Sequence, residues 1–198
     1  MARKKLGKYE IVDRLGRGGM AEVYRGYHPA LDRYVAIKLL HPFLSDDPEF
    51  KDRFENEARN VAKLKHANIV QVYDFEYDET NDNYYMVMEL ISGPTLKDRL
   101  IELSHRQGTF PVGEAVRIVH SAAEALAYAH QRGMIHRDVK PANLMLDDDQ
   151  RVVLTDFGIA KIVTGVQFTS SGGMVGTPAY MAPEQGLGEQ GDERSDLY

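Results

Sequence analysis

Apolar and polar residues alternate along positions 9–40, as half-buried strands require. Residues 9–12, 23–27 and 34–40 are rich in Val, Ile and Tyr, and glycine- or proline-containing turns separate them. After Pro48 the apolar residues recur at three- and four-residue steps up to Leu64, which predicts one face of a helix. Residues 69–75 and 84–88 follow as a predicted antiparallel strand pair around a polar loop.

The second half of the chain has a helical pattern. Gly93-Pro94 interrupts the chain, and a long helix is predicted over residues 112–131, ended by Gly133. Its apolar stripe consists of Val116, Val119, Ala122, Ala123, Leu126 and Ala129. The change from strands to helices near Ser92 predicts a bilobal α+β fold, with a tail over 1–8, a strand-rich lobe and hinge over 9–91 and a helical lobe over 92–198.

Composition narrows the class of protein. The chain has 198 residues, 43% of them hydrophobic and 27% charged, as in globular proteins. A formal charge of −6 argues against nucleic acid or an anionic membrane as a partner. The absence of cysteine excludes disulfides and thiolate chemistry. No apolar stretch approaches the roughly 20 residues of a membrane span, and no signal-peptide core is present, so we expect a cytoplasmic protein.

The candidate chemistry is concentrated in one passage. His136-Arg137-Asp138 is followed by Lys140, Asn143 and then Asp156-Phe157-Gly158. Two carboxylates and one carboxamide around a short strand-loop-strand can hold Mg²⁺ on a nucleotide and direct a hydroxyl at its terminal phosphate. The neighbouring run Asp147-Asp148-Asp149 is interpreted as a solvated hairpin turn and not as a metal site.

Two upstream motifs fit a bound phosphate. Glycines at positions 16, 18 and 19 let the backbone approach an anion closely, although a plain hairpin turn would give the same signal. In Val35-Ala36-Ile37-Lys38, alternation places Val35 and Ile37 on one side of a strand and Ala36 and Lys38 on the other. A lysine on such a strand needs an anionic partner, unless it is simply exposed.

Taken together and in this order, the motifs resemble those of serine/threonine protein kinases, most closely the bacterial branch. The resemblance implies a kinase fold that binds ATP between two lobes and transfers its γ-phosphoryl group to serine or threonine of proteins. It implies that Asp138 orients the hydroxyl, that Lys140 neutralises the transferring group, and that Asn143 and Asp156 hold Mg²⁺, or Mn²⁺ in its place. Lys38 would contact the α- and β-phosphates and pair with Glu57 in preference to Glu55.

The resemblance also implies the remaining nucleotide contacts. The glycine-rich loop would comprise Leu15, Gly16, Arg17, Gly18, Gly19, Met20, Ala21, Glu22 and Val23, with Ala21 in place of the family's third glycine. Backbone groups of Glu89 and Ile91 would bind the adenine edge. Val23, Ala36 and Met145 would cover its faces.

Further expectations concern regulation and acceptor type. Thr169 or Ser171, or both, would be autophosphorylated in an activation segment that also contains Ser170, and the phosphate would contact Arg137, because a guanidinium matches phosphate geometry. A plain polar loop is the alternative interpretation of this stretch. Thr177 would shape the acceptor site, and the residues around it, with Lys140, resemble serine/threonine rather than tyrosine kinases. His136 is expected to pack under Phe157 rather than to transfer protons.

The end of the chain resembles the start of a helix that is buried in the family's helical lobe. We therefore expect a C-terminally truncated kinase domain, in which the arginine partner of Glu184 lies beyond Tyr198. An inactive or regulatory ATP-binding fragment is the main alternative. A small-molecule phosphotransferase is a third reading, against which the peptide-receiving segment 176–184 argues. A homodimer, and membrane tethering through regions beyond Tyr198, are also compatible with the family.

Overall fold

The computed structural model describes residues 5–18, 21–41, 48–78, 83–157, 178–189 and 191–198, with side chains omitted over 48–54. These residues form two compact units. The first unit consists of Met1–Lys63 and Gln71–Leu90, and the second of Leu64–Val70 and Ile91–Tyr198.

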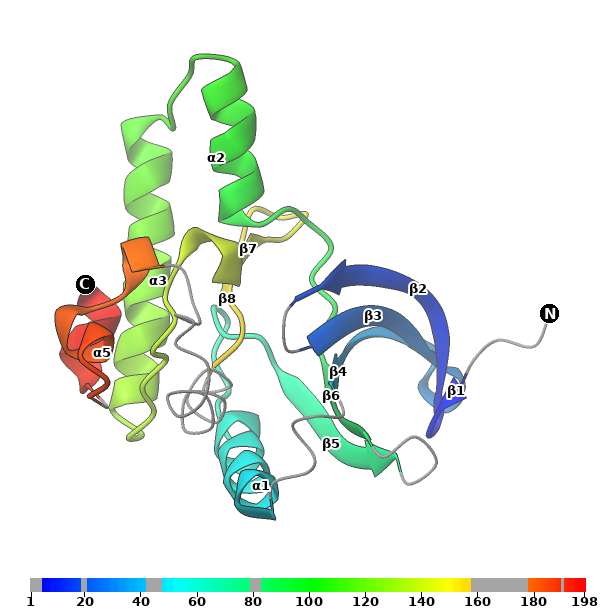
Figure 1. Cartoon of the computed structure of the whole chain (residues 1–198). Helices are drawn as coiled ribbons and strands as arrows, with labels where there is room; N and C mark the ends of the chain where they lie inside the picture. The colour runs from blue at the N-terminus through cyan, green and yellow to red at the C-terminus, as the bar shows by residue number, and fades with distance from the viewer. Residues whose placement is uncertain (1–4, 19–20, 42–47, 79–82, 158–177, 190) are drawn as a thin grey trace. The chain divides into compact units, whose positions relative to one another are not determined.

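The first unit is built on one curled antiparallel sheet, seen on the right of Figure 1. Its strand order is β1-β2-β3-β4-β6-β5. The strands are β1 (Lys5–Leu6), β2 (Tyr9–Arg17), β3 (Ala21–His28), β4 (Arg33–Leu40), β5 (Val72–Asp78) and β6 (Asn83–Met88). A short 3-10 helix, η1 (Pro29–Leu31), turns the chain between β3 and β4, and helix α1 (Pro48–Ala62) contacts β5. The predicted strands over 9–12, 23–27, 34–40 and 84–88 and the first helix are confirmed, and the strand predicted over 69–75 begins only at Val72.

The core of the first unit confirms the predicted alternation on β4. Val35 and Ile37 are completely buried, and they pack with side chains from β1, β2 and β6, namely Leu6, Tyr9, Tyr85 and Val87. Leu6 lies in the stretch expected to be a tail, yet β1 pairs with β2 and buries this side chain. One apolar residue between polar neighbours gives no periodicity, so the sequence could not indicate this strand.

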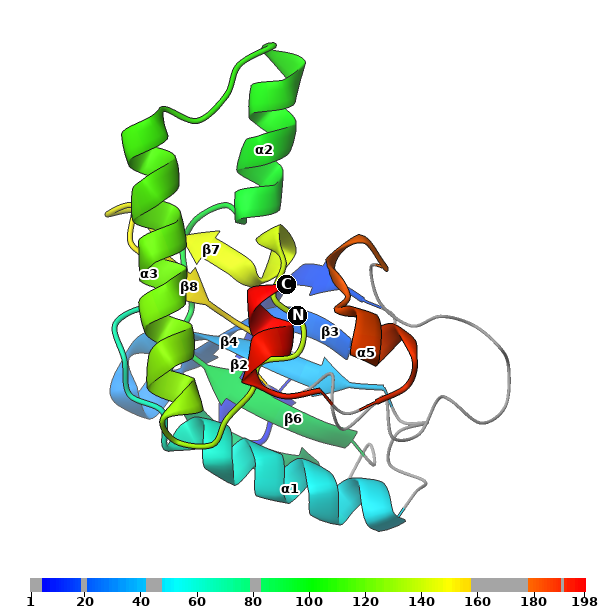
Figure 2. The same cartoon turned by 90° about the vertical axis from the view of Figure 1, so that its left-hand side faces the viewer.

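The second unit combines helices with a small hairpin. Its elements are α2 (Leu96–His105), α3 (Val112–His130), η3 (Pro141–Asn143), β7 (Leu144–Leu146), β8 (Val152–Leu154), η4 (Pro178–Tyr180), α5 (Pro183–Gly186) and η5 (Glu193–Leu197). Helices α2 and α3 lie side by side in both views (Figures 1 and 2). A capping box begins α2, because Thr95 and Asp98 exchange hydrogen bonds between side chain and backbone. No helix among the described residues has the length and apolar character that crossing a membrane requires.

Two predictions for this part of the chain are wrong in detail. Helix α3 buries Ile118, Ala125, Leu126 and Ala129, whereas Val116 and Val119 of the predicted stripe are 61% and 68% exposed. Apolar residues occupy more than one face of this helix, so the pattern alone could not select the packed face. Residues 69 and 70 do not extend β5; Ile69 instead forms a parallel bridge with Leu154 of the second unit, and Val70 N–H donates to the Leu154 carbonyl.

Candidate active site

Two polar residues that follow Asp138 in the sequence hold its carboxylate. Lys140 Nζ lies 2.7 Å from Asp138 Oδ2, and Asn143 Nδ2 donates to the same oxygen at 2.9 Å. Asn143 Nδ2 also donates to the Asp138 carbonyl at 2.8 Å. The short helix η3, which starts with Pro141, gives the chain the turn that brings Asn143 back to Asp138. Charge-assisted hydrogen bonds of this kind fix a carboxylate in one orientation.

His136 is a structural residue, as expected. It is completely buried, and its ring makes an edge contact with Phe157 at a centroid distance of 4.6 Å. Nδ1 accepts from the Asp138 N–H at 3.2 Å, so the proton lies on Nε2, which donates to the Thr155 carbonyl at 2.8 Å. Burial lowers the pKa of His136 and keeps the imidazole neutral. The ring therefore connects the backbone of residues 136–143, the candidate catalytic segment, with Thr155, the residue before Asp156.

Arg137 has a left-handed backbone, with φ of 65°. A non-glycine residue in this region costs on the order of 1 kcal/mol or more, so surrounding contacts must hold it. Asp196 supplies them: its Oδ1 accepts from Arg137 N–H at 2.6 Å and its Oδ2 from His136 N–H at 2.8 Å. His130, at the end of α3, binds the same carboxylate at 2.7 Å. Figure 2 shows η5, which carries Asp196, against α3.

The expected metal ligands are brought close together through their backbones. Thr155 N–H and its hydroxyl both donate to the Asn143 carbonyl, at 2.9 and 3.1 Å, which places Asp156 one residue from this contact. Asp156 is also left-handed, with φ of 64°. Mg²⁺ prefers oxygen ligands and usually takes only one or two carboxylates besides phosphates and water. The oxygens of Asn143 and Asp156 fit such a site, and no group of three or more metal-ligating acidic, histidine or cysteine side chains occurs in the described parts of the chain.

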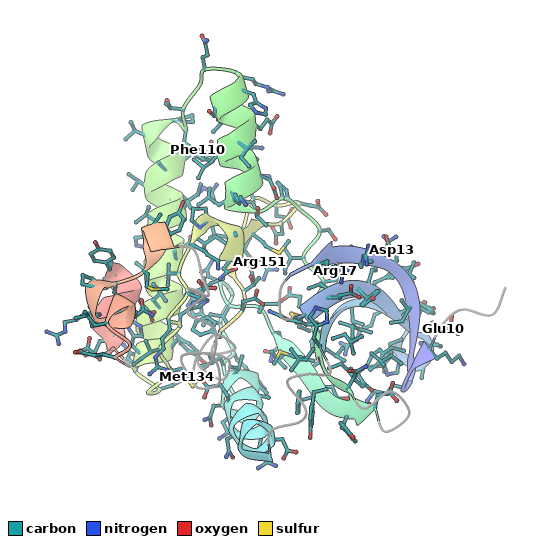
Figure 3. The ribbon with its side chains drawn as sticks, in the orientation of Figure 1. Glu10, Asp13, Arg17, Phe110, Met134 and Arg151 are labelled. Carbon is teal, nitrogen blue, oxygen red and sulfur yellow. The ribbon has the colours of Figure 1, made fainter. Side chains whose placement is uncertain are left out.

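The acidic run Asp147–Asp149 is a hairpin turn, as predicted. Asp147 Oδ1 accepts from the backbone N–H groups of Asp149 and Arg151, and its Oδ2 accepts from Arg151 Nε at 2.7 Å. Figure 3 shows Arg151, which also donates to the Ala67 carbonyl of the same unit. The carboxylate of Asp147 therefore serves the β7–β8 connection.

In the first unit, one face of the sheet carries three of the expected nucleotide contacts. Val23 on β3 is directly opposite Lys38 on β4, and Ala36 lies two residues before Lys38, so all three share a face. Glu55, the alternative partner considered for Lys38, forms an ion pair with Arg59 at 3.0 Å. The pairing of Lys38 with Glu57, which is half-buried on the same helix, stays a prediction.

The glycine-rich turn closes on itself, because Gly18 N–H donates to the Ala21 carbonyl at 2.8 Å. A Cβ added at Gly16 would meet no atom within 4 Å, so packing does not require glycine there. Open space on this side of the turn agrees with close approach of a ligand to the backbone.

A polar cluster beside this turn was missed by sequence reasoning. The carboxylate of Glu22 accepts a hydrogen bond from the Tyr24 hydroxyl, and Arg14 and Arg17 lie 3.3 and 3.4 Å from its Oε1. The Tyr24 hydrogen bond is the main reason why the pKa of Glu22 lies below its usual value. Figure 3 shows Arg17 on β2. Arg17 lies opposite Glu22 across the two strands, but this register includes two irregularities that the sequence pattern does not show.

The expected adenine contacts are divided between the units. Glu89 N–H donates to the Gln71 carbonyl at 2.8 Å, so any bond from the Glu89 backbone to a base would come from its carbonyl. Ile91 is buried, and Met145 is half-buried on β7, where it pairs with Val153.

Several predicted site residues lie outside the described residues. They are Gly19, Met20, Gly158, Thr169, Ser170, Ser171 and Thr177. Within the described chain the Ser195 hydroxyl donates to the Glu184 carboxylate and lowers the pKa of Glu184. The arginine expected beyond Tyr198 stays a prediction.

This geometry, a curled sheet with a lysine on one face and a left-handed catalytic segment anchored by a buried aspartate, defines the chain as protein-kinase-like. The sequence matches the protein kinase domain over residues 9–198. The chain therefore belongs to the protein kinase family.

Individual relatives agree with this assignment. The chain is 44% identical over 194 residues to the serine/threonine-protein kinase PknB of Mycobacterium leprae, covering 96% of this chain and 30% of the relative. It is also 44% identical to PksC of Streptomyces coelicolor, covering 97% and 35%. The crystal structure of the Mycobacterium tuberculosis PknI kinase domain matches with a TM-score of 0.80 at 34% identity, covering 100% of this chain and 73% of that chain. The chain thus spans about a third of the length of these curated relatives.

Proposed function

We propose that the protein transfers the γ-phosphoryl group of ATP to serine and threonine hydroxyls of proteins. The observation that carries this proposal is the carboxylate of Asp138, which is held by Lys140 and Asn143 in the second unit. Asn143 is in turn hydrogen-bonded to Thr155, the residue before Asp156. The names of the relatives as serine/threonine kinases support the acceptor type. Complete retention of the motif residues Lys38, Asp138, Asn143 and Asp156 favours an enzyme over an inactive ATP-binding fragment.

The proposed roles follow from the chemistry of each group. Asp138 accepts a hydrogen bond from the attacking hydroxyl and orients its lone pair toward the phosphorus. Lys140, held at the same carboxylate, offsets negative charge on the transferring phosphoryl group. In the first unit, Lys38 binds the α- and β-phosphates through its ammonium group, and Glu57 positions Lys38.

Divalent metal ions would be held by the oxygens of Asn143 and Asp156. Mg²⁺, or Mn²⁺ in its place, would neutralise charge on the phosphates when bound with ATP. The hydrogen bonds between Thr155 and the Asn143 carbonyl keep these two ligands in register before a metal ion binds.

The glycine-rich loop, residues 15–23, is proposed to cover the phosphates. The carbonyl of Glu89 and the backbone of Ile91 are proposed to bind the adenine edge, with Val23, Ala36 and Met145 against its faces. Use of ATP implies a cytoplasmic position for these residues. A homodimer and membrane tethering through other regions remain part of the proposal.

Regulation is proposed to act through Arg137. Autophosphorylation of Thr169, Ser170 or Ser171 would place a phosphate that a guanidinium can bind with two hydrogen bonds. Mass spectrometry after incubation with Mg²⁺-ATP is expected to find phosphate on this segment. A Thr169→Ala/Ser170→Ala/Ser171→Ala variant with full activity would contradict the proposed switch.

Phosphoamino-acid analysis of a general protein substrate tests the function itself. The full-length protein with radiolabelled ATP is expected to yield phosphoserine or phosphothreonine, and a small-molecule acceptor is expected to yield no product. Phosphate on small molecules alone would favour the small-molecule phosphotransferase, and ATP binding without any transfer would favour the inactive fragment.

A further inference from the structure

Gln185 connects the short helix α5 with the catalytic segment. Its Oε1 accepts from the Ala182 N–H at 3.0 Å, which closes the first turn of α5. Its Nε2 donates to the Arg137 carbonyl at 2.9 Å, across 48 residues of sequence. The side chain is half-buried. Both ends of the amide are therefore used, and the two partners, one donor and one acceptor, fix which end is oxygen and which is nitrogen.

The bond to Arg137 acts on the peptide group that leads into Asp138. The carbonyl of this peptide is held by Gln185, and its N–H, which belongs to Asp138, donates to His136 Nδ1 at 3.2 Å. A peptide group is planar, so holding both its oxygen and its N–H sets the orientation of the plane. The direction in which the Asp138 side chain leaves the backbone depends on that plane.

Arg137 needs such support because its φ of 65° is unfavourable for a residue with a Cβ. Asp196 accepts a hydrogen bond from the N–H of Arg137 at 2.6 Å, and Gln185 donates one to the carbonyl of Arg137 at 2.9 Å. The two contacts clamp Arg137 from opposite sides. Loss of either contact allows the left-handed residue to relax toward a commoner conformation and to turn the Asp138 carboxylate.

We propose that Gln185 is a positioning residue for phosphoryl transfer, which acts through the Arg137 carbonyl to orient Asp138. It thereby links the catalytic segment to helix α5, which follows residues 158–177 in the sequence. This inference rests on the proposed kinase function and assigns a residue outside the motifs that carry the resemblance.

The test separates the two hydrogen bonds of the Gln185 amide. Gln185→Glu keeps an oxygen for the Ala182 N–H, and an acidic residue near a helix start is favourable, so the cap of α5 is retained. The same substitution removes the donor to Arg137 and places two oxygens against each other. Gln185→Ala removes both bonds. Asp98→Ala is the matched control, because it removes the capping box of α2 in the same unit, where Asp98 hydrogen-bonds to Thr95.

In the full-length protein, kcat for a protein substrate is expected to fall about tenfold in Gln185→Glu and in Gln185→Ala, since one oriented hydrogen bond is lost. The affinity for Mg²⁺-ATP and the KM for the protein substrate are expected to stay within about twofold of wild type. Asp98→Ala is expected to keep the wild-type kcat. A cap-only role predicts instead that Gln185→Glu keeps full kcat and that only Gln185→Ala is impaired.

Wild-type kcat in Gln185→Glu would overturn this inference and leave the proposed function intact. A Gln185→Glu variant that loses ATP affinity by as large a factor as kcat, and that also has a lower melting temperature, would overturn it as well, because this result indicates a general structural role. Absence of phosphoryl transfer by the wild-type protein would overturn the proposed function, and this inference with it.

Discussion

Replacement of Gly93 by alanine tests the packing that supports the β7–β8 hairpin of the second unit. A Cβ at Gly93 would lie 1.8 Å from the Leu146 carbonyl oxygen and 3.3 Å from the Asp147 Cα. Both obstacles are backbone atoms, so no side chain can rotate away. Relief requires the segment at Gly93 to move away from β7.

The cost follows from what this movement breaks. Leu146 is completely buried, and its N–H donates to the Pro94 carbonyl at 3.0 Å. Overpacking, together with a buried N–H that loses its acceptor, is expected to lower the free energy of unfolding by about 2–4 kcal/mol. Met145, a proposed adenine contact, directly precedes Leu146 on β7 and would be displaced with it. We therefore expect weaker ATP binding as well.

Gly113→Ala is the matched control, because a Cβ at that position of helix α3 would meet nothing within 4 Å. It is expected to stabilise the protein by a few tenths to about 1 kcal/mol, through helix propensity. Urea denaturation of the full-length variants measures both effects as shifts of the midpoint at unchanged m-value. A Gly93→Ala midpoint equal to or above that of the wild type would refute the reasoning from backbone contact.

Two further predictions concern single side chains. Burial lowers the pKa of His136 in the folded state, so as the pH falls this imidazole is protonated in the unfolded chain before it is protonated in the folded protein. The free energy of unfolding should therefore fall by up to about 1.4 kcal/mol per pH unit below about pH 6.5. His136→Gln should reduce this dependence of the free energy of unfolding on pH, measured by denaturation at several pH values. The control His120→Gln, at an exposed histidine, should leave the pH dependence unchanged. Glu22→Ala is expected to raise the KM for ATP about three- to tenfold, because Glu22 holds Arg14, Arg17 and Tyr24 beside the glycine-rich turn. Asp13→Asn, which breaks the Arg25 ion pair on the same strands, should leave it unchanged, and equal effects would contradict a specific role for Glu22.

Sequence patterns predicted the strands well where one face is buried. The alternation in Val35-Ala36-Ile37-Lys38 is reproduced in full, because the core accepts only every second side chain. The candidate catalytic segment could be located for a different reason: the proposed chemistry demands fixed residue types at fixed spacing. The predicted contact of His136 with Phe157 is confirmed by the edge contact of the two rings.

Contacts between distant polar residues could not be predicted in this way. The bond from Gln185 to the Arg137 carbonyl and the clamp by Asp196 depend on backbone geometry that no periodicity encodes. The left-handed conformations of Arg137 and Asp156 are equally hidden, since neither residue is glycine. The packed face of α3 was missed because valines on the opposite side are just as apolar.

The most direct measurement compares ATP binding and phosphoryl transfer in Asp138→Asn. The carboxamide keeps the size of the side chain but cannot accept the proton of the attacking hydroxyl, so transfer to a protein substrate should fall at least about 100-fold. Titration calorimetry should give a Kd for Mg²⁺-ATP within about threefold of the wild-type value, because the proposed nucleotide and metal contacts are Lys38, Asn143, Asp156 and the glycine-rich loop. Transfer at the wild-type rate, or a loss of ATP affinity as large as the loss of transfer, would contradict the role assigned to Asp138.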